Sequence, residues 1–129
     1  MVVDTSALLA LLLDEAEAEA FRVAVEDDET RLVSAATLLE TAIVIETRKG
    51  EAGGRELDLL IHKAGMAVVA VDAEQVTAAR RAYRRFGKGR HAAGLNFGDV
   101  FAYALARTSG EALLFKGDDF SKTDISRAV

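Results

Sequence analysis

Four short apolar runs alternate with helical patterns along this chain of 129 residues, and this alternation constrains the fold more than any other feature. The runs are MVV at 1–3, RLVS at 31–34, AVVAV at 67–71 and ALLF at 112–115. Runs of this length and composition are typical of parallel strands that are buried on both faces. Because helical sequence separates each run from the next, we predict right-handed crossovers between parallel strands.

Helical patterns fill the sequence between the runs, and no proline interrupts them. They lie at 6–13, 17–26, 35–49, 55–64, 73–86 and 99–108. The glycines at Gly53-Gly54 and from Gly87 to Gly89 predict breaks between neighbouring helices. We therefore expect a single domain over 1–129 of the α/β class. Its predicted architecture is a three-layer α/β/α sandwich with a central, mostly parallel sheet of four to five strands, the fifth near Asp124-Ile125.

Composition limits both the chemistry and the location of the protein. The absence of cysteine excludes disulfides, thiolate zinc sites and thiol nucleophiles. The apolar start, MVVDTSALLALLL, has no basic region before it and is interrupted by Asp4, so it does not resemble a signal peptide. No apolar run approaches the roughly 20 residues that span a bilayer. We expect a soluble, cytoplasmic protein with no membrane partner.

Acidic residues follow the predicted strands at the edge where open α/β sheets form their sites. Asp4 ends the first run, and Glu40 lies in the first turns of the helix after the second run. Asp99 opens the apolar helix 99–108, and Asp118 and Asp119 follow the fourth run. Several carboxylates gathered without a local base suit a hard divalent cation, Mg²⁺ or Mn²⁺, which prefers oxygen ligands.

Glu40 is the most informative of these acids. Its neighbours on the helix face are Ala36, Ile43 and Val44, so the pattern predicts a buried carboxylate. A buried carboxylate without a partner costs several kcal/mol or takes up a proton. No Lys or Arg lies within one helical turn of Glu40, so a cation from elsewhere is expected to compensate its charge.

Each acid also has a structural explanation when it is considered alone. Asn96 and Asp99 have the spacing of a capping box, and Asp4 precedes a helix that it would cap. Asp118 and Asp119 have the character of turn residues. The convergence of all these positions on one sheet edge favours a metal site, because helix caps need not gather there.

The net charge of −5 conceals a local basic segment. Residues 80–90, RRAYRRFGKGR, carry six positive charges and no negative ones. The candidates for RNA phosphate contacts are Arg80, Arg84, Arg85, Lys88 and Arg90. A solvated face, or the acidic surface of a partner protein, explains the segment equally well.

The chain resembles the PIN-domain ribonucleases, specifically the VapC-type toxins of bacterial toxin–antitoxin pairs. The matching segments are VVDTSALLALLLDE, SAATLLETAIVIETRKG, LNFGDVFAYALA and LLFKGDDFSKTDI, in the order found in that family. The resemblance covers essentially the whole chain and implies that Asp4, Glu40 and Asp99 are catalytic acids that hold the metal. It places the fourth acid at Asp118 or Asp119.

The resemblance also implies a function and partners. Ser6 occupies a hydroxyl position that supports the acids by hydrogen bonding. The implied activity is Mg²⁺- or Mn²⁺-dependent hydrolysis of RNA, at a tRNA or ribosomal RNA loop, which inhibits translation. The implied partners are a VapB-like antitoxin, which neutralises the toxin, and a second copy in a homodimer.

Two other functions remain open from the sequence. A non-catalytic module that binds RNA or protein would share this fold. A receiver-like phosphoacceptor domain would use Asp72 and Lys116. It normally has an acidic pair after its first strand, where this chain has only Asp4, and Asp72 has the context of a helix cap.

Overall fold

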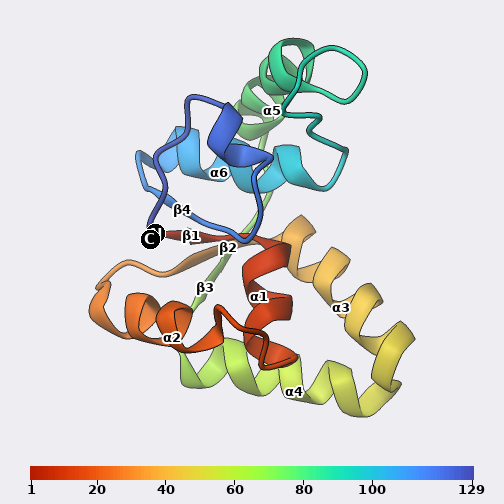
Figure 1. The fold of residues 1–129 in the computed structure, drawn as a ribbon, viewed down its shortest axis with the longest axis vertical. Coiled ribbons are helices and arrows are strands. Elements are labelled where there is room, and N and C mark those ends of the chain that lie inside the picture. Colours follow the sequence, from red (N-terminus) through yellow and green to blue (C-terminus); the bar gives the residue numbers. More distant parts are fainter.

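A parallel sheet of four strands organises the computed structural model, which describes residues 1–129 (Figure 1). Its strands, in the spatial order β3-β2-β1-β4, are β3 (Ala67–Val69), β2 (Leu32–Ser34), β1 (Val2–Val3) and β4 (Leu113–Leu114). Val2 pairs with Leu32 on one side and with Leu113 on the other. All pairings are parallel, as predicted, so the carboxyl ends of the strands share one edge of the sheet.

Helices cover both faces of this sheet. They are α1 (Thr5–Leu12), α2 (Ala18–Asp27), α3 (Ala35–Lys49), α4 (Glu51–Lys63), α5 (Ala73–Phe86) and α6 (Asp99–Ser109). In Figure 1, α5 and α6 lie above the sheet, and α1, α2 and α4 lie below it. Helix α3 packs against α1 and α4. The predicted three-layer α/β/α sandwich is therefore confirmed. None of these helices combines the length and the apolar character that a membrane crossing requires.

The two sides of the sheet have separate hydrophobic cores. Val2 and Leu113 belong to the core beneath α5 and α6. Their neighbours Val3 and Leu114 belong to the core formed with α1 and α2. Successive residues of a strand point to opposite faces, so even a strand of two residues anchors both layers. Helix α1 buries Leu8 and most of its other apolar side chains, which makes it a core helix.

The strand number agrees with the prediction of four to five, but the burial predicted for β3 is wrong. β3 was expected to be buried, but it forms one edge of the sheet, and Val68 is 47% exposed. No fifth strand forms at Asp124-Ile125. Arg127 instead makes an isolated parallel bridge with Leu113, whose amide donates to the Ser126 carbonyl at 2.8 Å.

The predicted break at Gly53-Gly54 is also wrong, since both residues lie inside α4. The chain turns instead at Gly50, which adopts the positive φ of 68°. Gly53 serves helix packing, because a Cβ there would lie 2.7 Å from the carbonyl oxygen of Ile45 on α3. The predicted break at Gly87 is confirmed, because α5 ends there.

Candidate metal centre

Asp4 stands at the carboxyl end of β1 and caps α1. Its Oδ2 accepts hydrogen bonds from the Ser6 amide at 3.0 Å and from the Ser6 hydroxyl at 2.7 Å. Burial raises the pKa of Asp4 to about 6, against the opposing effect of the two Ser6 hydrogen bonds. The negative charges of Asp99 and Glu40 raise it further. Both hydrogen bonds use Oδ2, so Oδ1 keeps its lone pairs for another ligand.

Ser6 connects Asp4 to the end of β4. Its hydroxyl donates to Asp4 and accepts a hydrogen bond from the Lys116 amide at 3.0 Å. The Lys116 ammonium forms ion pairs with Glu15 and Glu17. Ser6 therefore positions Asp4, while the lysine charge is balanced by two other acids.

Glu40 reaches the same sheet edge from the second turn of α3. Its Oε1 accepts a hydrogen bond from the Thr5 hydroxyl at 2.5 Å. On its other side the carboxylate lies against the backbone at Gly98, where any Cβ would overlap Oε2. Gly98 therefore leaves the space that lets Glu40 lie beside the start of α6.

The predicted burial of Glu40 among apolar neighbours is wrong. The side chain is only half-buried, and Ile43 is 58% exposed. The buried face of α3 consists of Thr37, Thr41 and Ile45. The apolar pattern predicted the wrong buried face of α3, because threonines occupy core positions of this helix. A threonine hydroxyl can bond to the helix backbone, and the Thr41 hydroxyl donates to the Thr37 carbonyl.

Asp99 is both a helix cap and a member of the acidic group. Its Oδ2 accepts a hydrogen bond from the Asn96 amide at 2.9 Å, and its own amide donates to Asn96 Oδ1 at 3.0 Å. The predicted capping box is therefore present. Burial raises the pKa of Asp99, the Asn96 hydrogen bond lowers it, and the charges of Asp119 and Glu40 raise it again. Oδ1 takes no part in the cap.

The two acids after β4 differ in their relation to the group. Both side chains are exposed. The charge of Asp119 contributes to the raised pKa of Asp99, whereas Asp118 contributes to none of the raised pKa values in the group. The structure thus brings Asp4, Glu40, Asp99 and Asp119 into one electrostatic neighbourhood.

No cation balances these four carboxylates. The ion pairs of the protein include none of them. No group of three or more acidic side chains is arranged to hold an ion by itself. Oxygen donors with free lone pairs around uncompensated charge nevertheless fit Mg²⁺, which keeps several waters and binds through few carboxylates.

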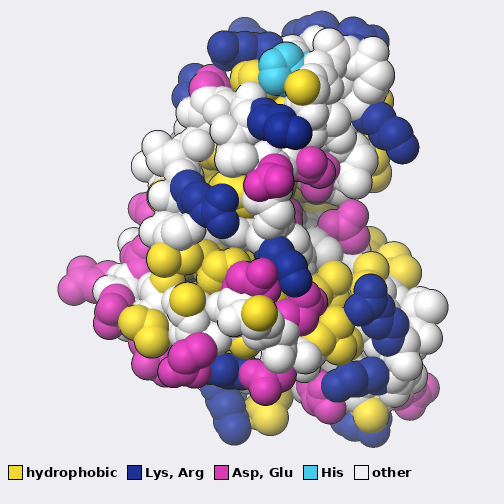
Figure 2. Space-filling view, in the orientation of Figure 1, with side chains coloured by type: hydrophobic (Ala, Val, Ile, Leu, Met, Phe, Trp, Pro, Cys, Tyr) yellow, Lys and Arg dark blue, Asp and Glu magenta, His cyan; other side chains and the backbone are white.

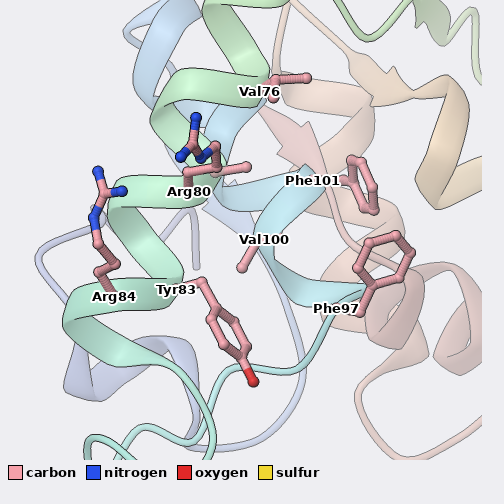
Figure 3. A pocket seen from close by; sticks show the side chains of 8 residues that line it. Val76, Arg80, Tyr83, Arg84, Phe97, Val100 and Phe101 are labelled. Atoms are coloured by element: carbon pink, nitrogen blue, oxygen red, sulfur yellow. The ribbon is translucent and has the colours of Figure 1, made fainter.

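The basic residues of segment 80–90 do not form one surface. Figure 2 shows Lys and Arg side chains gathered over the α5 end of the molecule, with Asp and Glu side chains beneath them. Arg80 and Arg84 line a groove beside α6 (Figure 3). Arg85 faces another side of α5 and pairs with Asp124 at 3.2 Å. Arg90 lies over the Tyr83 ring at 5.8 Å. Lys88 takes part in no ion pair.

Two residues that contact the acids were not recognised from the sequence. Thr5 bonds to Glu40, and Gly98 makes room for it. The available signals were a second hydroxyl directly after a strand-end acid and a glycine directly before the acid that opens a helix. The alternative of a receiver-like phosphoacceptor domain has no support, since Asp72 caps α5 and Lys116 is paired with glutamates.

Comparison with known families identifies the class of protein that this fold and site define. A family model described as the PIN domain matches residues 1–126. The chain therefore belongs to the PIN-domain family, which confirms the resemblance noted in the sequence.

Relatives define the group within that family. A ribonuclease VapC of Mycolicibacterium smegmatis is 64% identical, covering 98% of both chains. Ribonuclease VapC30 of Mycobacterium tuberculosis is 63% identical, covering 98% of this chain and 96% of the relative. These similarities confirm the predicted endoribonuclease class.

Solved structures confirm the fold. Mycobacterium tuberculosis VapC20, described as a sarcin-ricin loop cleaving toxin, superposes with a TM-score of 0.78 at 20% identity, over 96% of this chain and 95% of that one. VapBC2 of Rickettsia felis, bound to a DNA fragment from its promoter, gives 0.76 at 11% identity, over 98% and 94%.

Proposed function

We propose that this endoribonuclease uses a divalent metal, Mg²⁺ or Mn²⁺, held by Asp4, Glu40 and Asp99, with Asp119 as the fourth acid. The observation that carries the proposal is the uncompensated charge at the sheet edge. Asp4 is 3% exposed, and its pKa is raised by burial and by two neighbouring acids, yet no cation pairs with it. Perturbed acids gathered in this way are typical of functional sites.

The protein's own residues would prepare the site for RNA. Ser6 fixes Oδ2 of Asp4 and leaves Oδ1 free, so Oδ1 could hold the ion. Thr5 holds Glu40 in the same way through one carboxylate oxygen. The metal, when bound, would activate a water and stabilise the charge that develops on the scissile phosphate. By likeness to the family the products are a 5′-phosphate and a 3′-hydroxyl.

The substrate and partners of the proposed function follow from the relatives. A structural neighbour cleaves the sarcin-ricin loop, and we infer that an exposed loop of a tRNA or ribosomal RNA is the substrate here. Another neighbour is a VapBC pair, and we infer that a VapB-like antitoxin covers the acids and neutralises the toxin. We further infer a homodimer that acts in the cytoplasm, where tRNA and ribosomal RNA take part in translation.

Cleavage of total RNA by the antitoxin-free protein tests this function. The wild type is expected to cut in Mg²⁺ or Mn²⁺ and to stop in EDTA. Asp99→Asn keeps the oxygen that accepts the Asn96 hydrogen bond but removes the charge, so it is expected to fold normally and to lose cleavage.

A matched pair of variants separates the two acids after β4. Asp119→Asn is expected to reduce cleavage, whereas Asp118→Asn is the control, because Asp118 does not affect the pKa of Asp99, and is expected to cut like the wild type. If Asp99→Asn cuts as fast as the wild type, Asp99 is only a cap and the metal centre is wrong. If the wild type binds RNA but cuts none with either metal, a non-catalytic module is the better description.

A further inference from the structure

A groove of about 560 Å³ lies between α5 and α6 (Figure 3). Its walls are mostly apolar, with Val76 and Tyr83 on α5 and Val100 on α6. Phe97 borders the groove just before α6 begins, and Arg80 and Arg84 line it from α5. The groove therefore combines aromatic rings with positive charge.

Phe97 is an unusual residue to leave in solvent. It is 77% exposed, more than any other large hydrophobic side chain of the protein. Its ring packs edge to face against the ring of Phe101, with the two ring centroids 5.0 Å apart and the ring planes at 89°. This contact holds the ring in place and leaves most of it free for another planar group. Large exposed aromatic side chains of this kind mark binding surfaces.

The position of Phe97 links the groove to the proposed metal centre. Only Gly98 separates it from Asp99, and Gly98 is the residue against which the Glu40 carboxylate lies. A phosphodiester placed at the acids would therefore carry its neighbouring nucleoside over the start of α6. The groove lies next to that path.

The charges of the groove complement a polyanion. Arg80 and Arg84 form no ion pair within the protein, unlike Arg85, which is paired with Asp124. Two unpaired guanidinium groups beside aromatic rings match the alternation of phosphates and bases in single-stranded RNA.

We propose that this groove binds an unstacked base of the RNA substrate, adjacent to the scissile phosphate, with the base against Phe97 and flanking phosphates at Arg80 and Arg84. The proposal rests on the proposed ribonuclease function and extends it to a base-binding subsite. Bases splayed out of a loop and stacked on aromatic side chains are the usual means by which proteins recognise RNA sequence.

A second copy of the chain is a less suitable occupant of the groove. A two-fold contact centred on the groove would repeat the same patch on both sides. It would bring Arg80 and Arg84 of one copy toward the same residues of the other, with no acid among the groove's lining residues to balance them. RNA instead supplies both the aromatic surface and the negative charge.

The test compares two RNA probes in EDTA, so that metal-dependent cleavage cannot affect the result. One is a fluorescein-labelled single strand of about 12 mixed-sequence nucleotides, a length within the usual site sizes of single-strand binding folds. The other has the same ribose-phosphate backbone without bases. Affinities are measured by fluorescence anisotropy for the wild type, Phe97→Ala and Phe97→Trp, with Leu59→Ala as the control on α4, where Leu59 is also half exposed.

Phe97→Ala is expected to weaken binding of the base-bearing RNA about tenfold, in line with the loss of one stacked base. The same variant should bind the abasic RNA within about twofold of the wild type, because no stacking is lost there. Phe97→Trp should keep the affinity for the base-bearing RNA, and Leu59→Ala should change neither affinity.

Three outcomes would overturn the subsite. These are an equal loss on both probes, no loss on either, and a wild type that binds neither. If the loss is equal and sedimentation shows that Phe97→Ala dissociates a dimer, the groove is an interface between copies. Failure of the proposed ribonuclease function is distinguishable, since base-dependent binding without any metal-dependent cleavage would reject that function and keep the subsite.

Discussion

The two ends of the central sheet carry acids in opposite states. At the carboxyl end, Asp4 and its neighbours face no cation, and burial raises the pKa of Asp4 to about 6. At the amino end, the Met1 ammonium group bonds to Asp28 and to Glu111, each at 2.9 Å. The hydrogen bond from the Met1 amine lowers the pKa of Asp28. Both clusters lie within a strand's length of each other on the same sheet.

The difference shows which acids stabilise the fold and which weaken it. The amino-end acids neutralise a buried amine, so their charge contributes to stability. At the carboxyl end, burial and neighbouring negative charges raise the pKa of Asp4 and of Asp99, so the charge of these two acids costs stability in the metal-free protein. A cost retained at one edge of a well-packed sheet points to function there.

Asp4→Asn should give the largest effect. It should lower the cleavage activity and raise the stability of the metal-free protein. Loss of groups that merely orient metal ligands typically costs 10- to 100-fold, so removal of Asp4, a direct ligand in the proposed site, is expected to reduce cleavage by more than about 100-fold. The metal-free variant should meanwhile unfold at a higher urea concentration than the wild type near pH 7. A variant that retains wild-type cleavage would show that the two sheet ends do not differ in function.

The pH dependence of the metal-free protein sharpens the same contrast. The folded pKa of Asp4, about 6, lies above its ordinary value of 3.8, so the folded state holds the proton more tightly. Stability should therefore fall as the pH rises from about 4 to beyond 6, by roughly 3 kcal/mol from this group. Urea unfolding of the wild type and Asp4→Asn in EDTA across this range isolates the contribution, and excess Mg²⁺ should abolish the fall. A wild type as stable as Asp4→Asn at every pH would contradict it.

Gly98→Ala should disturb the acids while leaving the fold intact. The residue has helical angles that alanine accepts, but the new Cβ would displace the Glu40 carboxylate. We expect the Mg²⁺ concentration for half-maximal cleavage to rise about 10- to 100-fold. Gly54→Ala is the control, because its Cβ would meet only the mobile end of Glu46. Equal behaviour of the two variants would show that the space at Gly98 has no role in the site.

Asp28→Asn tests the amino end of the sheet. Its side chain is 32% exposed, so solvent screens part of the ion pair with Met1, and Glu111 keeps a second pair. The variant is expected to lose about 1 kcal/mol of unfolding free energy and to cleave RNA at the wild-type rate. Urea denaturation and the cleavage assay check both parts, and a clear loss of cleavage in a folded variant would break the distinction between the two ends.

Substitution of single arginines on α5 should give the smallest of these effects, a change in the salt dependence of RNA binding. Arg80→Gln removes an unpaired charge, and it should lower the salt dependence of single-stranded RNA binding by about 0.7 in the log–log slope. Arg85→Gln should change that slope less, because Asp124 already balances Arg85. Binding measured over a salt series compares the two. Equal slopes would mean that the pairing with Asp124 does not remove Arg85 from the RNA surface.

Local patterns were sufficient for the fold class and for the position of most acids of the candidate site. The alternation of apolar runs with helices predicted a parallel sheet, and parallel strands necessarily place their carboxyl ends together. Asp4 and Asp99 could be assigned to that edge because each adjoins the boundary of an element that the sequence marks clearly. The capping role of Asp99 was predictable for the same reason, since a capping box spans only four residues.

Packing decided the rest. The contact of Glu40 with Thr5 joins residues 35 apart, and the contact of Ser6 with Lys116 joins residues 110 apart. Which strand lies at the edge, and whether Arg85 or Arg84 meets an acid, likewise depend on how the helices pack on the sheet. An apolar pattern records which side chains avoid water, whereas it does not record which distant partners they meet. The sequence by itself therefore determined the acids and the edge where they lie, and only the tertiary structure decided how they are held and which charges remain unbalanced.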